Sequence, residues 1–136
     1  MNTLTVGDQA PSFTLNDQDN NPVTLSELQG NKVLIYFYPR ASTPGCTIQA
    51  QGLRDYKAEL DAHNVVVLGL SPDTPKKLTN FINKQELNFT LLADEEHAVC
   101  EKYGVWQLKK FMGSENMGVV RTSFLINETG DIEHVF

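Results

Sequence analysis

Cys46 is the residue in this sequence that is best placed to act as a nucleophile. Thr43 and Pro44 come shortly before it and predict the start of a helix, because Thr caps helices and Pro favours the first helical position. Cys46 is then the third residue of that helix. Backbone N–H groups without partners and the positive end of the helix dipole favour an anion there, such as a thiolate. The spacing indicates a reactive cysteine at a helix N-terminus.

Hydrogen-bond donors surround this cysteine in the sequence. The Thr43 hydroxyl and the backbone N–H groups of Gly45 and Cys46 are able to bind the atoms that a thiolate attacks. Spacing alone leaves a second interpretation open. In that interpretation Thr43 only caps the helix and Cys46 only packs in the core, since free cysteines are among the most buried residue types.

The strand before this segment, residues 33–38, is apolar on both faces and therefore belongs in the middle of a sheet. Its carboxyl end leads to Cys46, and open α/β sheets usually place their sites at that end of a strand. The other predicted elements are an N-terminal β-hairpin (13–15 with 23–25), a helix from Pro44 to Asn64, strands at 65–70 and 88–92, a helix starting at Thr74-Pro75, a helix capped by Asp94 that ends at Gly104, and a C-terminal hairpin (122–126 with 132–136).

This order of elements predicts the fold class. Strands that alternate with helices imply right-handed crossovers and parallel strand pairs, while the terminal hairpins add antiparallel strands. The expected fold is a mixed α/β sandwich, with a central mixed β-sheet flanked by helices. A length of 136 residues predicts a single domain over residues 1–136. Sheets of this kind normally carry helices on both faces, so a C-terminal helix after residues 132–136 is expected to be missing.

Composition and charge exclude several classes of function. The chain has 11 Lys and Arg against 17 Asp and Glu, a net charge of -6, which disfavours nucleic acids and anionic membranes as partners. Its apolar runs are too short to cross a membrane, and its start has no signal-peptide features, so a cytoplasmic location is predicted. In a reducing compartment the two cysteines, Cys46 and Cys100, are expected to be free or catalytic, and they are too few for a four-cysteine zinc site.

The pattern Pro39-x-x-x-Thr43-x-x-Cys46 after an apolar strand resembles the active-site signature of the peroxiredoxins. The whole chain resembles their Q-type branch, which is also called the bacterioferritin comigratory proteins. The matching segments occur in order along the chain: GDQAP (7–11), GLRD (52–55), FTLLAD (89–94), YGVW (103–106) and RTSFLI (121–126).

This resemblance implies a thioredoxin-like fold and the reduction of hydrogen peroxide or alkyl hydroperoxides, without a metal, haem or flavin. Cys46 would be the peroxidatic nucleophile that becomes a sulfenic acid. Thr43 would hydrogen-bond the peroxide, Pro39 would shield the sulfur from water, and Arg121 would hold its guanidinium against the sulfur and the peroxide oxygens. From its own sequence context, Arg121 is instead expected to be a solvated charge at the edge of a sheet.

The sequence departs from the family at the resolving cysteine. Many Q-type members carry that cysteine five residues after the first, where this chain has Gln51, and others carry it on the following helix, which has none here. Cys100 is the one internal candidate for a resolving residue, and its apolar neighbours suggest a buried helical face. A one-cysteine mechanism is therefore expected, with thioredoxin, glutaredoxin or a small thiol as the external reductant. The protein is expected to be a monomer or a weak dimer.

Two alternative functions stay open at this point. A thioredoxin-like disulfide reductase needs a second cysteine three residues after the first, and Gln49 occupies that position. A non-catalytic binding or holdase protein would use an apolar patch that a missing helix leaves exposed. Peroxide consumption with and without a reductant separates these functions from a peroxidase.

Overall fold

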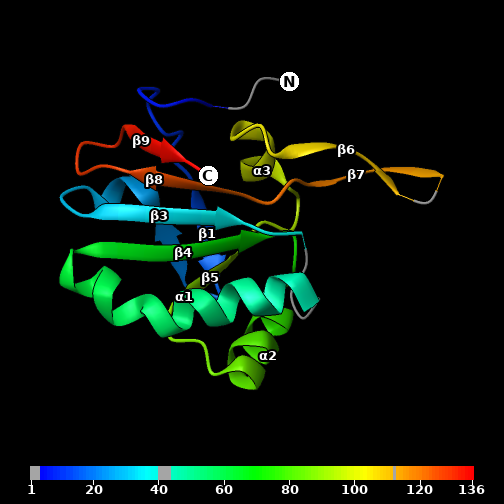
Figure 1. Cartoon of the computed structure of the whole chain (residues 1–136), viewed down its shortest axis with the longest axis horizontal. Coiled ribbons are helices and arrows are strands. Elements are labelled where there is room, and N and C mark those ends of the chain that lie inside the picture. The colour runs from blue at the N-terminus through cyan, green and yellow to red at the C-terminus, as the bar shows by residue number, and fades with distance from the viewer. Residues whose placement is uncertain (1–3, 40–43, 112) are drawn as a thin grey trace.

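The computed structural model describes residues 4–39, 44–111 and 113–136. A seven-stranded sheet with the order β2-β1-β5-β4-β3-β8-β9 forms its centre, and β6 and β7 make a separate two-stranded sheet (Figure 1). The elements are β1 (Thr14–Asp17), β2 (Pro22–Thr24), the 3-10 helix η1 (Leu25–Leu28), β3 (Lys32–Phe37), α1 (Pro44–Ala62), β4 (Val65–Ser71), α2 (Pro75–Gln85), β5 (Thr90–Ala93), α3 (Ala98–Lys102), β6 (Trp106–Phe111), β7 (Ser114–Val119), β8 (Thr122–Ile126) and β9 (Ile132–Val135).

Both parallel and antiparallel pairs occur in the large sheet. Strand β4 pairs in parallel with β3 and with β5, while β8 pairs antiparallel with β3 and with β9. The predicted N-terminal hairpin forms as β1 and β2, and β1 also pairs antiparallel with β5. The prediction of a mixed sheet with antiparallel terminal hairpins is confirmed.

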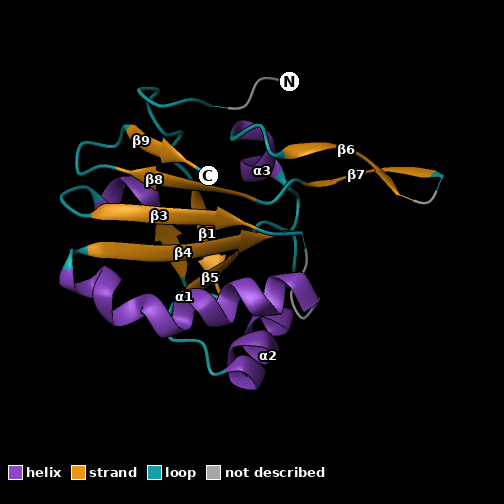
Figure 2. Cartoon of the chain, viewed as in Figure 1, coloured by secondary structure: helices purple, strands orange, loops and turns teal. Residues whose placement is uncertain are grey.

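The two faces of the sheet carry separate cores. Along β3, Ile35 and Phe37 point to one face, where they pack with α3, while Tyr36 and the following Tyr38 point to the other. Helices α1 and α2 cover the tyrosine face, and Figure 2 shows them together on one side of the strands. A strand that is apolar on both faces is therefore buried between two layers, as its sequence predicts.

A glycine in β4 makes room for one of these tyrosines. A Cβ atom placed on Gly69 would lie 2.7 Å from the Tyr36 ring and 2.8 Å from the Leu91 side chain. Both distances are shorter than a carbon–carbon contact allows, so any larger residue at this position would displace the ring. Gly69 therefore leaves the space beside β4 that the Tyr36 ring occupies.

The segment after β5 differs from the sequence prediction in two ways. The helix predicted to start at Asp94 begins only at Ala98, because His97 adopts a left-handed conformation (φ 51) just before it. Asp94 still provides hydrogen-bond acceptors for the first N–H groups of the helix. Its carboxylate accepts hydrogen bonds from the N–H groups of Val99 (3.3 Å) and Cys100 (2.8 Å). The hairpin of β6 and β7 was not predicted at all, and the following strand starts at Thr122.

Candidate active site

Cys46 lies in the first turn of α1, directly beyond the carboxyl end of β3. Its side chain is 1% exposed and packs in the core that contains Tyr36 and Tyr38. Its predicted neighbour Thr43 lies outside the described residues. The sulfur is thus held on rigid elements and shielded from bulk water, which is how a site fixes the direction of an attacking group.

Arg121 reaches this sulfur from a segment that is distant in the sequence. Its Nη2 atom donates a hydrogen bond to the Cys46 Sγ atom at 3.2 Å, across a separation of 75 residues. Coulomb attraction from the guanidinium stabilises negative charge on the sulfur. Although Arg121 is exposed overall, its charged end lies against the thiol. The expectation from local sequence alone, a purely solvated edge charge, does not hold.

The register of the sheet explains how Arg121 arrives there. Strand β8 runs antiparallel to β3, and Thr122 lies opposite Phe37, the last residue of β3. Arg121, one residue earlier, therefore lies at the carboxyl end of β3, where the chain turns toward α1. The N–H group of Val120 donates to the Val105 carbonyl at 2.8 Å and holds the segment before Arg121 in place.

Aromatic rings form the inner wall beside Cys46. The rings of Tyr36 and Tyr38 are stacked with centroids 5.2 Å apart, and Tyr38 also contacts the Phe81 ring of α2. Burial raises the pKa of both tyrosines, so both remain neutral phenols at physiological pH. Both tyrosines are fully buried and act as packing residues of the core.

Pro39 follows Tyr38 at the end of this strand and is partly buried. The Tyr38 N–H donates to the Leu70 carbonyl at 3.1 Å, which extends the contact between β3 and β4 by one residue. Pro39 has no N–H group, so the ladder between these strands cannot continue past it. The proline thus marks the point where the chain leaves the sheet before the Cys46 helix.

Cys100 lies on the opposite face of the sheet from Cys46. It is fully buried in the core formed with Phe37 and Tyr103, and both cysteines are free thiols. Burial, and next the neighbouring Asp94 carboxylate, raise the pKa of the Cys100 thiol. The structure therefore brings Arg121 to Cys46 and keeps Cys100 away from both.

We expect the stability of the fold to fall as the pH rises above about 9, the ordinary pKa of the Cys100 thiol. Burial raises the pKa values of Cys100 and of Tyr36, Tyr38 and Tyr103, so above that pH the unfolded chain releases protons that the folded chain retains. The free energy of unfolding then decreases by up to about 1.4 kcal/mol per pH unit for each such group. Chemical denaturation from pH 7 to pH 11 measures this slope.

Cys100→Ala provides the control for this slope. The variant lacks one of these four buried groups, so its free energy of unfolding should fall less steeply with pH than that of the wild type, whatever its value at pH 7. Equal slopes in the two proteins would contradict the conclusion that burial keeps the Cys100 thiol neutral.

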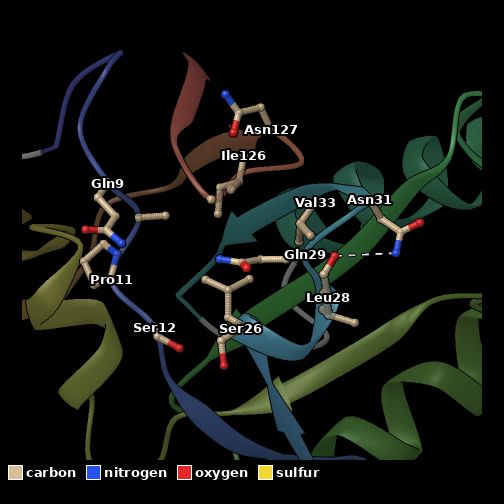
Figure 3. A pocket seen from close by; sticks show the side chains of 13 residues that line it. Gln9, Pro11, Ser12, Ser26, Leu28, Gln29, Asn31, Val33, Ile126 and Asn127 are labelled. Atoms are coloured by element: carbon tan, nitrogen blue, oxygen red, sulfur yellow. Dashed lines mark hydrogen bonds between the residues drawn. The ribbon is translucent and has the colours of Figure 1, made fainter.

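A cavity of about 300 Å³ lies elsewhere in the fold (Figure 3). It is lined in part by Val33, at the start of β3, and Ile126, at the end of β8, so it lies at the end of these strands that is remote from Cys46. Gln9, Gln29 and other neutral side chains line the rest, and none of its lining residues is ionisable. Cys46 and this cavity are thus at different ends of the sheet.

Two kinds of feature are absent from the residues that the structure describes. Within that part of the chain, no three His, Cys, Asp or Glu side chains gather as a set of metal ligands. No helix in the same part is both long and apolar enough to cross a membrane.

The sequence of this chain is similar to those of known proteins of one family. The sequence profile of the AhpC/TSA family matches residues 6–135. The chain is 62% identical over 136 residues to the putative peroxiredoxin bcp of Haemophilus influenzae, covering 100% of this chain and 88% of that protein. It is 57% identical over 136 residues to peroxiredoxin Bcp of Escherichia coli K12, covering 100% of this chain and 87% of that one.

Solved structures show the same fold. The bacterioferritin comigratory protein of Xanthomonas campestris has a TM-score of 0.86 at 31% identity, over 91% of this chain and 79% of that chain. A cysteine-to-serine mutant of Xylella fastidiosa PrxQ has a TM-score of 0.93 at 26% identity, over 100% of this chain and 87% of that chain. A mixed sheet with a thiol on the helix after its central strand defines a thioredoxin-fold thiol protein. The chain belongs to the AhpC/TSA family, in the Q-type branch of the peroxiredoxins.

Proposed function

We propose that this peroxiredoxin reduces hydrogen peroxide and alkyl hydroperoxides with Cys46 as the peroxidatic nucleophile. The observation that carries the proposal is the hydrogen bond from the Arg121 guanidinium to the Cys46 sulfur, at 3.2 Å in a shielded site. The Xanthomonas campestris relative, whose structures concern alkyl peroxide reduction, supports the choice of substrate class.

The reaction needs a hydrogen-bond or proton donor for the negative charge that develops on the sulfur and on the departing oxygen. The thiolate attacks one peroxide oxygen, so an S–O bond forms while the O–O bond breaks. The departing oxygen leaves as water or an alcohol after it takes up a proton, and Cys46 becomes a sulfenic acid. Arg121 stabilises the charge on sulfur and oxygen during this step, the Thr43 hydroxyl binds the peroxide, and Pro39 limits the access of water.

Recycling is proposed to follow a one-cysteine mechanism with an external thiol, such as thioredoxin, glutaredoxin or a small thiol. A disulfide requires Cα atoms within about 7 Å of each other. The separation of Cys46 and Cys100 by the sheet supports an external partner over an internal disulfide. The external thiol reacts with the sulfenic acid to give a mixed disulfide and water, and a second thiol then releases the Cys46 thiolate.

Mass spectrometry of the protein after one equivalent of peroxide tests this proposal. The expected product is a single added oxygen on the peptide that contains Cys46, which a sulfenic-acid trap captures. Addition of a small thiol should convert it to a mixed disulfide. An unmodified Cys46 after peroxide treatment would overturn the proposed function.

Cys100→Ala is expected to leave the oxidation of Cys46 at the wild-type rate within about twofold, because Cys100 is buried on the other face of the sheet. Stopped-flow oxidation with peroxide measures the rate. Turnover with thioredoxin should also persist in this variant. If turnover with thioredoxin fails but turnover with a small thiol continues, Cys100 is the resolving residue and the one-cysteine mechanism is wrong.

A binding function remains the second candidate because one apolar groove is open. Leu34, Leu60, Leu125 and Phe136 line it on the α1 side of the sheet, and Phe136 is 70% exposed. Catalytic peroxide consumption with a reductant favours the peroxidase. Stoichiometric oxidation of Cys46 without recycling, together with suppressed aggregation of an unfolded protein, favours the binding function.

A further inference from the structure

Helix α1 is fastened to the end of α2 by side chains that follow Cys46. The Gln51 Nε2 atom donates to Gln85 Oε1 at 2.9 Å, and the Arg54 Nη1 atom donates to the Gln85 carbonyl at 2.7 Å. Both bonds are partly buried. We call Gln51, Arg54 and Gln85 the Gln85 clamp.

The geometry at the end of α2 favours this contact. Gln85 is the last residue of α2, and Glu86 after it adopts a left-handed conformation (φ 54) that ends the helix. Carbonyl groups in the last turn of a helix lack intrahelical partners and carry the negative end of the dipole, so a cationic donor such as Arg54 suits them. The Asn88 Nδ2 atom also donates to the Arg54 carbonyl at 3.2 Å and adds a further bond between the two segments.

The clamp lies at the base of the segment that carries the reactive sulfur. Gln51 and Arg54 follow Cys46 by five and eight residues, which is about one and a half to two turns of helix. The first turns of α1 therefore extend from the clamp to Cys46 as one unit. The clamp holds this unit against the end of α2.

Access to Cys46 depends on this unit. The sulfur is 1% exposed, and the thiol of a protein reductant, which is attached to a broad surface, cannot reach it while the helix is closed. A small peroxide needs far less room than a protein. Opening of the first turns of α1 is thus needed for recycling by a protein thiol but not for oxidation by peroxide.

We infer that the Gln85 clamp sets how often the first turns of α1 open to present oxidised Cys46 to a protein thiol. This inference rests on the proposed function of Cys46. The step that opening permits is the attack of the external thiol on the sulfenic acid, which forms the mixed disulfide and releases water. The clamp residues are positioning residues, because they act through the helix and do not touch the sulfur.

Single-turnover reduction of oxidised protein by excess reduced thioredoxin tests this inference. The rate should reach a plateau as the thioredoxin concentration rises, and the plateau measures helix opening. Gln51→Ala and Gln85→Ala each remove one neutral hydrogen bond, so each should raise the plateau about threefold to tenfold. The double variant should match either single variant, because both changes break the same bond. Oxidation by peroxide should stay at the wild-type rate.

Lys57→Ala is the matched control. It breaks the ion pair from Lys57 to Asp61 at 2.6 Å, which lies within α1 and does not reach α2, so the plateau should not change.

Gln51→Glu combined with Gln85→Lys replaces the hydrogen bond with an ion pair and should return the plateau toward the wild-type value. Plateaus equal to that of the wild type in both alanine variants, or additive effects in the double variant, would overturn the inference.

Hydrogen exchange of the reduced protein separates this inference from the proposed function. The backbone amides of residues 48–53 should exchange about threefold to tenfold faster in Gln51→Ala than in the wild type, with no peroxide or reductant present. Unchanged exchange in these amides overturns the clamp even if Cys46 reacts as proposed. Faster exchange in a protein whose Cys46 does not react with peroxide supports the clamp and rejects the peroxidase.

Discussion

Cys46→Ser is expected to abolish peroxide reduction while the fold stays intact. A serine hydroxyl occupies nearly the same volume as the thiol and is well accepted near a helix N-terminus, but it does not ionise at neutral pH. It therefore cannot supply the anionic nucleophile that the proposed reaction needs at this position, where the Arg121 guanidinium lies 3.2 Å from the wild-type sulfur. Consumption of hydrogen peroxide with a thiol reductant measures the loss, and circular dichroism checks the fold.

Cys100→Ala serves as the companion variant, because it removes the other thiol from the opposite face of the sheet. It should consume peroxide while Cys46→Ser does not. Peroxide consumption by a pure and folded Cys46→Ser sample would mean that another group carries the reaction, and the assignment of the site would be wrong.

Arg121→Met is expected to slow the oxidation of Cys46 by a hundred- to a thousandfold. The guanidinium is a charged donor to the sulfur within a shielded site, and the loss of one such donor typically costs ~3–4 kcal/mol in the transition state. Methionine keeps much of the length of the side chain without its charge. Stopped-flow measurement of the peroxide step gives the rate, and the free energy of unfolding should change little.

Arg121→Lys separates charge from geometry at this position. An ammonium keeps the positive charge but lacks the planar fork that faces sulfur and oxygen together, so only part of the rate should return. Oxidation of Arg121→Met at the wild-type rate would show that the contact with Cys46 has no role in catalysis.

The central elements could be predicted from the sequence because their signals are local. Residues 33–38 and 65–70 are continuous apolar runs, and both become parallel neighbours in the sheet. Thr74 caps α2 as expected, since its side chain accepts a hydrogen bond from the Lys77 N–H at 3.3 Å. Asn64, the expected end of the first helix, adopts a left-handed conformation (φ 57) just past α1.

The hairpin of β6 and β7 could not be predicted in the same way. Lys109 and Lys110 interrupt the alternation of apolar and polar residues that Trp106 and Leu108 begin, and Gly118 weakens the second strand. Leu108 and Met117 pair across the two strands and are about half exposed, so no buried core marks them in the sequence. The hydrogen-bonded pairing of β6 with β7, and not a buried apolar face, defines this hairpin.

The candidate site shows the same division between local and distant signals. Its thiol could be predicted from the spacing of Thr43, Pro44 and Cys46, because helix capping depends on adjacent residues. Arg121 enters the site through the antiparallel register of β8 on β3, which no property of its neighbours encodes. The family resemblance pointed to Arg121, while local sequence pointed to an edge charge. The burial of Cys100 could be predicted, but not the face of the sheet on which it lies.

The close approach of Gly69 to the Tyr36 ring and the Leu91 side chain links positions that must change together. Any side chain at position 69 would occupy the space of both groups, so such a substitution becomes acceptable only with smaller residues at positions 36 and 91. Tyr36 in turn stacks on Tyr38, which packs in the same core as Cys46. A mutation in the middle of β4 would therefore affect the surroundings of the Cys46 thiol through two aromatic rings. During divergence of this protein, a substitution of Gly69 should appear only together with smaller residues at positions 36 and 91.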